Sequence, residues 1–381
     1  MEKNLETLCV HGDQHRFPDS RDALSMPIYQ TAAFAHPDLG HSPDRFYYTR
    51  LTNPTRNHLE ETVSALEGAA DTVAFATGMA AISAVFELFN PGDRILCSAD
   101  LYGGTVLLFD LVARKNGLIL DFVDTTDPDV LTKAMDASVK AIYIETPSNP
   151  MMNVTDIALC GRLAKEQGAL LIVDNTFLSP YFQNPIALGA DIVVHSGTKY
   201  LGGHNDTLAG FVCAADAAVA EKVRKISVAT GGNLAPFDSW LMIRGIKTLA
   251  VRMDRAQENA LAIAEFLRSH PKVKKVHYVG LPEHPGYAVN KKQSRGSGAM
   301  LSFEVDSQET ALQVLAKVKI ITFAESLGGP ESLITLPVTQ THADVAPAEL
   351  QKLGITDSLL RMSVGLENAK DLIADLQQAL A

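Results

Sequence analysis

The sequence contains few cysteines, and none of them is spaced for metal binding. The four cysteines of the 381-residue chain, Cys9, Cys97, Cys160 and Cys213, lie far apart. No pair forms a redox motif or a zinc-ligand pair, and a disulfide framework is unusual in so long a chain. The eleven histidines are also scattered, without a His-Glu-x-x-His motif. We therefore expect a reduced, cytoplasmic protein that holds no metal ion.

The sequence also lacks the features of membrane and nucleic-acid-binding proteins. No apolar run approaches the ~20 residues that a membrane-spanning helix needs. The stretch Met1-Glu-Lys-Asn-Leu-Glu-Thr7 has no apolar core or processing site, so we do not expect secretion. The 44 acidic residues outnumber the 33 basic ones, and the net charge of -11 argues against a nucleic-acid surface. Internal repeats and low-complexity tracts are absent too.

What the sequence does contain is enough apolar residues to fill a large interior. Hydrophobic residues make up 46% and charged residues 20% of the chain, as is typical of a globular protein. A chain of this length suits two domains. Residues 1–47 lack sustained periodicity and carry several prolines, so we expect an arm that lies on something else, such as another subunit.

Strand and helix patterns alternate after the arm. Short apolar runs such as 141–145 and 170–174 predict buried strands, and turn residues separate them from helical stretches. Repeated βαβ units predict a mostly parallel sheet with helices on both faces. We expect an α/β domain over residues 48–236 and a smaller α+β domain over 237–381. A long helical stretch, from about residue 238 to 269, would follow the domain boundary.

The stretch Asp191-Ile-Val-Val-His-Ser-Gly-Thr-Lys-Tyr200 carries the strongest chemical signal. Its start predicts a parallel strand, and Ser196, Thr198 and Lys199 follow at the carboxyl end, where ligands bind in open α/β sheets. The preceding predicted strand ends in Asp174. A desolvated lysine amine and an acid for a pyridine nitrogen are what pyridoxal 5'-phosphate (PLP) chemistry needs. We interpret the pair as a PLP site; a surface lysine and a capping aspartate are the alternatives.

Several further positions fit such a site, each with a structural alternative. Thr77-Gly78-Met79 lies at a strand-to-helix turn, where backbone amides can bind phosphate or simply form a turn. Tyr102 follows a strand and can stack on a flat ring or cover the core. Arg361, in an apolar strand, can bind a substrate carboxylate or form a structural ion pair. Tyr48 and Arg50 offer a second cation and phenol for a phosphate.

Nine motifs along the chain carry a family resemblance. They are Tyr48-Thr-Arg-Leu-Thr-Asn-Pro-Thr55, Gly78-Met-Ala-Ala-Ile82, Tyr102-Gly-Gly-Thr105, Glu145-Thr-Pro-Ser-Asn-Pro150, Val173-Asp-Asn-Thr176, His195-Ser-Gly-Thr-Lys-Tyr200, Arg244-Gly-Ile-Lys-Thr248, Ala324-Glu-Ser-Leu-Gly-Gly329 and Leu360-Arg-Met-Ser-Val-Gly365. In content and order they resemble the Cys/Met-metabolism (trans-sulfuration) family of PLP-dependent enzymes. This family includes cystathionine γ-synthases, cystathionine lyases, methionine γ-lyases and homoserine sulfhydrylases. The resemblance covers essentially the whole chain.

The resemblance implies the type I fold of PLP-dependent transferases and a role for each matched residue. Lys199 would bind PLP covalently, Asp174 would hold its pyridine nitrogen, and Tyr102 would stack on its ring and assist proton movement. The phosphate of PLP would be bound by Gly78, Met79, Ser196 and Thr198, and by Tyr48 and Arg50 of a neighbouring subunit. The amino-acid substrate would be bound by Asn149, Glu325, Ser326 and Arg361. The family usually forms homotetramers, which are dimers of dimers with shared active sites.

The resemblance is strongest to bacterial cystathionine γ-synthases that also act as O-acetylhomoserine thiol-lyases. It implies γ-replacement on an O-acylated homoserine by cysteine or sulfide. Glu325 stands where family γ-synthases and γ-lyases carry an acid, and Gly104 replaces the cysteine of methionine γ-lyases. Leu107 and Tyr47 depart from the residues of several cystathionine-handling relatives. The alternative is a cystathionine γ- or β-lyase, which releases a 2-oxo acid and ammonia.

Two other classes fit the sequence less well. A PLP-binding regulator without turnover usually carries a DNA-binding domain, for which this acidic chain has no spare segment. A nucleotide-binding α/β enzyme would show Gly-x-Gly-x-x-Gly after a strand, and that motif is absent. The sequence therefore favours a PLP-dependent enzyme.

Overall fold

The computed structural model describes residues 3–12, 23–36, 38–40, 45–343 and 345–381. The remaining parts of the predicted arm over residues 1–47 lie outside the described residues. The helices are α1 (Leu5–His11), α2 (Pro54–Glu67), α3 (Gly78–Phe86), α4 (Gly103–Leu108), α5 (Pro128–Ala134), α6 (Ile157–Gln167), α7 (Ser179–Phe182), α8 (Ala217–Thr230), α9 (Pro236–Ile246), α10 (Leu249–Ser269), α11 (Tyr287–Gln293), α12 (Gln308–Lys317), α13 (Pro347–Leu353) and α14 (Ala369–Leu380). Within the arm, α1 packs against α2 and α10, and its Cys9 is buried.

A seven-stranded sheet organises the amino-terminal part of the chain, in the order β1-β7-β6-β5-β4-β2-β3. Its strands are β1 (Asp71–Phe75), β2 (Arg94–Ser98), β3 (Ile119–Val123), β4 (Val139–Glu145), β5 (Leu170–Asp174), β6 (Ile192–Ser196) and β7 (Gly210–Ala214). Strand β7 is antiparallel to both of its neighbours, and the other neighbouring strands are parallel. The prediction of a large, mostly parallel sheet is confirmed.

Helices cover both faces of this sheet because its strands are apolar on both sides. In β5, Leu171 and Val173 belong to the core that contains residues of α2 and α6. Ile172, between them, belongs to a second core with residues of α3 and α8. Successive strand side chains point to opposite faces, so a continuous apolar run requires a helical layer on each.

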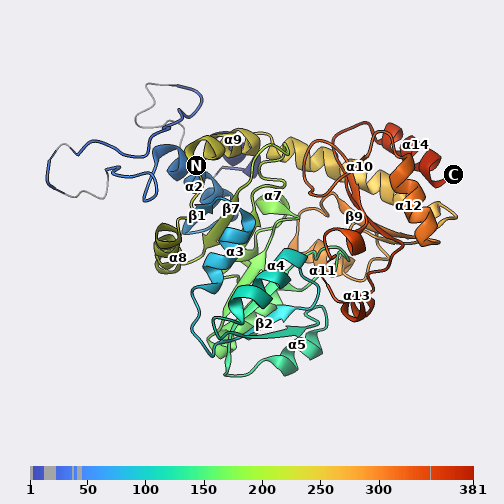
Figure 1. Ribbon diagram of the computed structural model, residues 1–381, viewed down its shortest axis with the longest axis horizontal. Helices are drawn as coiled ribbons and strands as arrows, with labels where there is room; N and C mark the ends of the chain where they lie inside the picture. The colour runs from blue at the N-terminus through green and yellow to red at the C-terminus, as the bar shows by residue number, and fades with distance from the viewer. Residues whose placement is uncertain (1–2, 13–22, 37, 41–44, 344) are drawn as a thin grey trace.

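A five-stranded sheet forms the second unit, in the order β10-β11-β12-β9-β8. Its strands are β8 (Val273–His277), β9 (Met300–Val305), β10 (Thr322–Phe323), β11 (Leu333–Thr335) and β12 (Leu359–Ser363). Helices α10 and α12 pack against this sheet, and α14 packs against both helices. Figure 1 shows α9 and α10 running along one edge of the molecule, from the large sheet toward the small one.

Two helices, α9 and α10, occupy the stretch over residues 238–269 that is predicted to be helical, with a short break between them. The break at Lys247–Thr248 is stabilised by Arg252, whose side chain turns back to donate to the carbonyl of Gly245 at 2.8 Å. The same guanidinium donates to the carbonyl of Tyr200 at 2.7 Å. This break depends on a contact with a distant loop, so helical periodicity alone does not reveal it.

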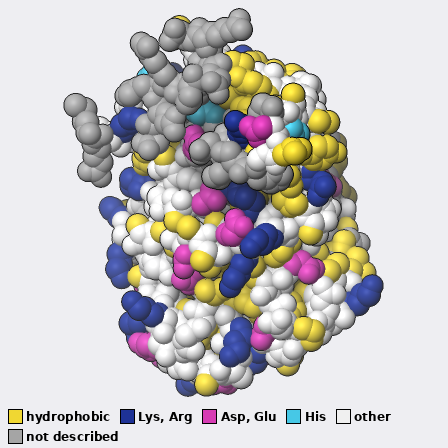
Figure 2. Space-filling view, turned by 90° about the vertical axis from the view of Figure 1, so that its left-hand side faces the viewer, with side chains coloured by type: hydrophobic (Ala, Val, Ile, Leu, Met, Phe, Trp, Pro, Cys, Tyr) yellow, Lys and Arg dark blue, Asp and Glu magenta, His cyan; other side chains and the backbone are white. Residues whose placement is uncertain are grey.

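The surface carries charges of both signs. On the face shown in Figure 2, Lys and Arg side chains are interspersed with Asp and Glu side chains. In the described part of the chain, no helix is both long and apolar enough to cross a membrane.

Candidate active site

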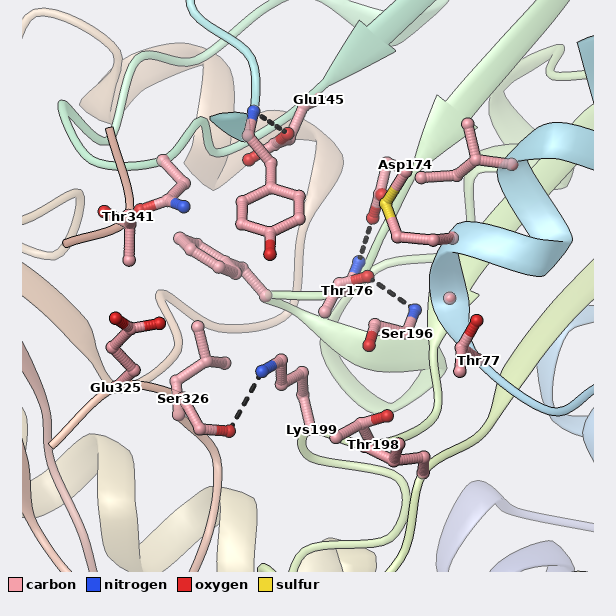
Figure 3. A pocket seen from close by; sticks show the side chains of 18 of the residues that line it. Thr77, Glu145, Asp174, Thr176, Ser196, Thr198, Lys199, Glu325, Ser326 and Thr341 are labelled. Carbon is pink, nitrogen blue, oxygen red and sulfur yellow. Dashed lines mark hydrogen bonds between the residues drawn. The ribbon is translucent and has the colours of Figure 1, made fainter. Parts of the chain in front are cut away.

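A cavity of about 230 Å³ lies where β4, β5 and β6 end. Eleven of the thirteen predicted site residues line it (Figure 3). These are Gly78, Met79, Tyr102, Asn149, Asp174, Ser196, Thr198, Lys199, Glu325, Ser326 and Arg361. The carboxyl ends of neighbouring parallel strands meet at one edge of a sheet, which is why residues spread over the first two hundred positions converge here.

Lys199 presents a largely buried amine to the cavity. Its Nζ donates a hydrogen bond of 2.9 Å to Oγ of Ser326 (Figure 3). Burial, aided by the neighbouring Arg361 charge and opposed by Glu325, lowers the pKa of Lys199 to about 8. A substantial fraction of such an amine is therefore unprotonated near neutral pH, as a nucleophile or base requires.

The segment that brings Ser326 to Lys199 has an unusual backbone. Ser326 has φ +83°, a conformation that non-glycine residues rarely adopt and that is concentrated at functional sites. Two residues later, Gly328 also has a positive φ, and a Cβ there would lie 2.7 Å from the backbone nitrogen of Tyr200. A glycine at position 328 therefore lets this segment lie directly against the chain that follows β6.

Asp174 and Glu145 form a pair of buried carboxyl groups at the ends of β5 and β4. The two residues are in register on neighbouring parallel strands, and they are 9% and 7% exposed. Oδ1 of Asp174 accepts a hydrogen bond of 3.0 Å from the backbone amide of Thr176. Burial raises the pKa of Asp174, and the hydrogen bonds from Thr176 oppose this shift. A cationic ring nitrogen would offset the cost of burying the charge of Asp174.

The amino terminus of α3 borders the cavity and can bind an anion. Its first residues, Gly78 and Met79, line the cavity, and the first amides of a helix have no partner within the helix. A Cβ at position 78 would lie 2.9 Å from Cβ of Ser196, so glycine permits the close approach of α3 to the end of β6. Thr198 lines the same region, where its hydroxyl accepts a hydrogen bond from the amide of Ala209 at 3.1 Å.

Arg361 is a buried cation at the cavity whose hydrogen-bond partners are uncharged. It lies on β12 and is 2% exposed. Its guanidinium donates to Oδ1 of Asn149 at 2.8 Å and to the carbonyl of Ser326 at 3.1 Å. Its Nε is buried and has no hydrogen-bond partner among the described residues. Burial lowers the pKa of Arg361 to about 10. A carboxylate ligand would supply the missing negative charge.

Tyr102 is half-buried, with its ring at the cavity. Burial, and next the charge of Glu325, raise the pKa of the Tyr102 phenol, so it keeps its proton at neutral pH. Lys199 is therefore better suited than Tyr102 to act as the base. A Cβ at position 104 would lie 2.5 Å from Cε1 of Tyr102, so Gly104 allows the ring to fold over the first turn of α4.

Tyr48 and Arg50 do not line this cavity. They border a separate depression together with Asn233, and Arg50 donates to the carbonyl of Val228 at 2.7 Å. Their predicted contact with phosphate is expected across a subunit boundary, and it stays a prediction.

Thr77, from the turn predicted to bind phosphate, also lines the cavity. Seven cavity residues were not predicted to form the site. They are Ile82, Glu145, Thr176, Phe177, Leu208, Leu327 and Thr341. Glu145 and Thr176 lie at or just after strand ends, so the rule that identified Asp174 also points to them. Thr341 has no such local signal, because its place depends on a loop that lies against α4. A Cβ on Gly103 would come within 2.4 Å of the Thr341 carbonyl oxygen.

The arrangement fits PLP better than a metal ion. In the described part of the chain, no group of three His, Cys, Asp or Glu side chains could hold a metal. The cavity instead combines a buried amine, a buried carboxyl group and a helix amino terminus. These groups match the aldehyde, the pyridine nitrogen and the phosphate of PLP.

Comparisons with known proteins agree with this interpretation. The sequence profile of one family, described as "Cys/Met metabolism PLP-dependent enzyme", matches residues 6–381. The chain is 46% identical to a cystathionine γ-lyase of Bacillus subtilis over 375 residues, which cover 98% of each chain. It is 45% identical to a cystathionine β-lyase of Lactococcus lactis over 377 residues, which cover 99% of each. The crystal structure of a cystathionine γ-synthase from Xanthomonas oryzae, in complex with aminoacrylate and cysteine, is 41% identical. It superposes with a TM-score of 0.96 and covers 100% of this chain and 98% of that one.

Proposed function

The chain belongs to the Cys/Met-metabolism family of PLP-dependent enzymes, and from this premise we propose that it catalyses γ-replacement on an O-acylated homoserine. Cysteine or sulfide would be the incoming nucleophile. The observation that carries the proposal is the pairing, in one cavity, of the buried Arg361 cation with the exposed carboxylate of Glu325. Arg361 would bind the α-carboxylate of the ester substrate, and Glu325 would attract the ammonium group of an incoming amino acid.

Several residues would hold the cofactor. Lys199 would bind its aldehyde carbon, Asp174 would pair with its pyridine nitrogen, and Gly78, Met79 and Ser196 would bind its phosphate. When bound, PLP supplies an electron sink for the electron pair left behind when a proton leaves a carbon of the amino acid.

Lys199 would move the protons of the reaction. With a pKa of about 8, its amine can accept the Cα proton and later return it. The Ser326 hydroxyl, which accepts a hydrogen bond from Nζ, would orient the amine toward the substrate. After passing the first proton to the bound cofactor, the Lys199 amine would take a second proton from Cβ, and the acyloxy group would leave Cγ as a free carboxylate. The thiol would then add at Cγ as its thiolate, and the two protons would return to Cβ and Cα. Apolar side chains of the cavity, among them Phe177 and Leu208, would limit the access of water.

A steady-state comparison of substrates tests this proposal. The wild-type enzyme would be supplied with O-acetyl- or O-succinylhomoserine plus cysteine, and separately with cystathionine alone. Mass spectrometry would identify the products. We expect cystathionine and the free acyl acid from the first mixture, at the higher kcat/KM. Faster turnover of cystathionine than of either ester would reject γ-replacement as the main reaction.

Elimination from cystathionine is the second candidate function, and the similarity to two cystathionine lyases favours it. The same groups would serve elimination, since Lys199 can remove the Cα proton in either reaction. Leu107, which departs from several cystathionine-handling relatives, is 45% exposed and does not line the cavity. Release of ammonia and a 2-oxo acid from cystathionine would identify this activity.

We further propose a cytoplasmic homotetramer with shared active sites. The proposal is supported by the position of Tyr48 and Arg50, outside the cavity of their own chain, and by four buried cysteines without a disulfide. Mixing the inactive variants Lys199→Ala and Arg50→Ala under conditions of subunit exchange tests the sharing of sites. A shared site predicts recovered activity, because a hybrid dimer contains one site with both wild-type residues. Light scattering would measure the number of subunits.

A further inference from the structure

We propose that Glu145 is a positioning residue that anchors the backbone of Tyr102 beside Asp174. The inference rests on the proposed function, because it assigns Tyr102 and Asp174 to one PLP site. Glu145 lines the same cavity, and the role proposed for it is exerted through its neighbour Tyr102.

The contact between Glu145 and Tyr102 is a single hydrogen bond at a critical turn. Oε2 of Glu145 accepts from the backbone amide of Tyr102 at 3.0 Å (Figure 3). Tyr102 is the N-cap residue of α4, and its own side chain makes no capping hydrogen bond. The next two residues, Gly103 and Gly104, have no side chains that could fix the turn. The carboxyl group of Glu145 therefore provides the cap that α4 lacks, and the backbone it holds determines where the Tyr102 ring lies.

The surroundings of Glu145 favour its neutral form. Asp174 is its in-register neighbour, Asp100 also acts on it, and both side chains are buried. Burial, and next the charge of Asp174, raise the pKa of Glu145 well above its ordinary value, and the amides of Tyr102 and Asn149 oppose this only in part. Two adjacent buried carboxylates cannot both be ionised without a large cost.

The charges that surround the two acids decide which of them keeps the proton. Asp174 is stabilised as an anion by both the amide and the hydroxyl of Thr176, and a cationic pyridine would add to this. The Arg361 cation also interacts with Glu145, but burial and the two nearby acids, Asp174 and Asp100, favour the uncharged form. Glu145 therefore holds the proton, and Asp174 keeps the negative charge that a pyridine nitrogen requires.

Two substitutions of Glu145 separate anchoring from charge. Glu145→Leu removes the acceptor for the Tyr102 amide, whereas Glu145→Gln keeps an acceptor oxygen in the shape of the neutral acid. We expect Glu145→Leu to lose about 10- to 100-fold in kcat/KM, mostly in kcat, because misplaced groups reduce rate more than binding. Glu145→Gln should rescue most of this loss. The matched substitution Asp174→Asn should lose activity. It should also raise the dissociation constant for PLP, measured by absorbance titration.

A double-mutant cycle shows whether Glu145 acts through Tyr102. If it does, Glu145→Leu should have little further effect in a Tyr102→Ala background. A purely structural loss would instead be additive. Additive effects, a Glu145→Gln variant as impaired as Glu145→Leu, or a fully active Glu145→Leu variant would each overturn the proposal.

In each of these experiments, the kcat/KM of the variant is compared with that of the wild-type holoenzyme, measured with whichever substrate the wild type turns over. A wild-type enzyme that cleaves cystathionine but does not use homoserine esters would therefore overturn the proposed γ-replacement without touching the assignment of Glu145.

Discussion

Replacing Lys199 with methionine should stabilise the cofactor-free protein at neutral pH while abolishing its activity. Burial lowers the pKa of this lysine from 10.5 to about 8, so the folded state binds the proton less tightly than the unfolded state does. The cost to folding is fully present below pH 8 and disappears as the pH rises toward 10.5. At about 1.4 kcal/mol per pH unit, the cost at pH 7 is roughly 3 kcal/mol.

Other consequences of the substitution do not depend on pH in this window. Loss of the hydrogen bond to Ser326 costs about 1 kcal/mol. The buried methionine side chain changes the packing energy by an amount that does not vary with pH. The stability difference between Lys199→Met and wild type should therefore fall by about 2 kcal/mol between pH 7 and pH 9.5.

Urea unfolding of the two cofactor-free proteins, at equal protein concentration and at both pH values, measures this difference. Lys222→Met is the matched control, because Lys222 is exposed on α8 and its substitution should leave the pH dependence unchanged. A Lys199→Met protein no more stable than wild type at pH 7, or a stability difference that stays constant up to pH 9.5, would refute the desolvation argument.

Three further outcomes follow from the geometry. Gly103→Ala places a Cβ 2.4 Å from the backbone carbonyl oxygen of Thr341, so the turn that carries Tyr102 must shift and kcat should fall by about tenfold; Gly232→Ala, whose Cβ would meet no atom closer than 3.6 Å, should leave it unchanged. Arg361→Lys loses the forked donor, so KM for the amino acid should rise by about 10- to 100-fold without a matching fall in kcat; an unchanged KM would contradict the carboxylate role. Glu67→Leu leaves a buried imidazole without its partner at 2.8 Å, and the free energy of unfolding should drop by about 1–3 kcal/mol. An unchanged free energy of unfolding, measured by chemical denaturation, would show that the Glu67–His195 pair does not stabilise the protein.

The sequence was most informative where function depends on strand ends. The apolar runs before Asp174 and Ser196 predict parallel strands, and the carboxyl ends of such strands meet at one edge of the sheet. That rule and the spacing of the motifs suffice to place Asp174, Ser196, Thr198 and Lys199 together, and all four line one cavity. The same rule extends to Glu145, which ends β4. The sequence pattern assigns Glu145 no role, because its role depends on its neighbour in the sheet, Asp174.

The sequence was less informative about contacts between segments that lie far apart in the chain. Ser326 lies 127 positions from Lys199, and it reaches the amine through a strained φ and a close approach at Gly328. No local periodicity encodes such a contact; the family resemblance implied only that Ser326 lies beside the substrate-binding residues. The break between α9 and α10 was missed for the same reason, since Arg252 stabilises it through a loop near Tyr200.

By itself, then, the sequence determined the layered α/β architecture, the strand-end acid and amine, and the family. These properties follow from periodicity and from motifs that are local in the chain. Only the tertiary structure decided the protonation of the groups, because the pKa values of Lys199, Glu145 and Arg361 depend on burial and on neighbours from other strands. Desolvation and charge–charge repulsion act through space, and they exist only once the two sheets have enclosed the cavity.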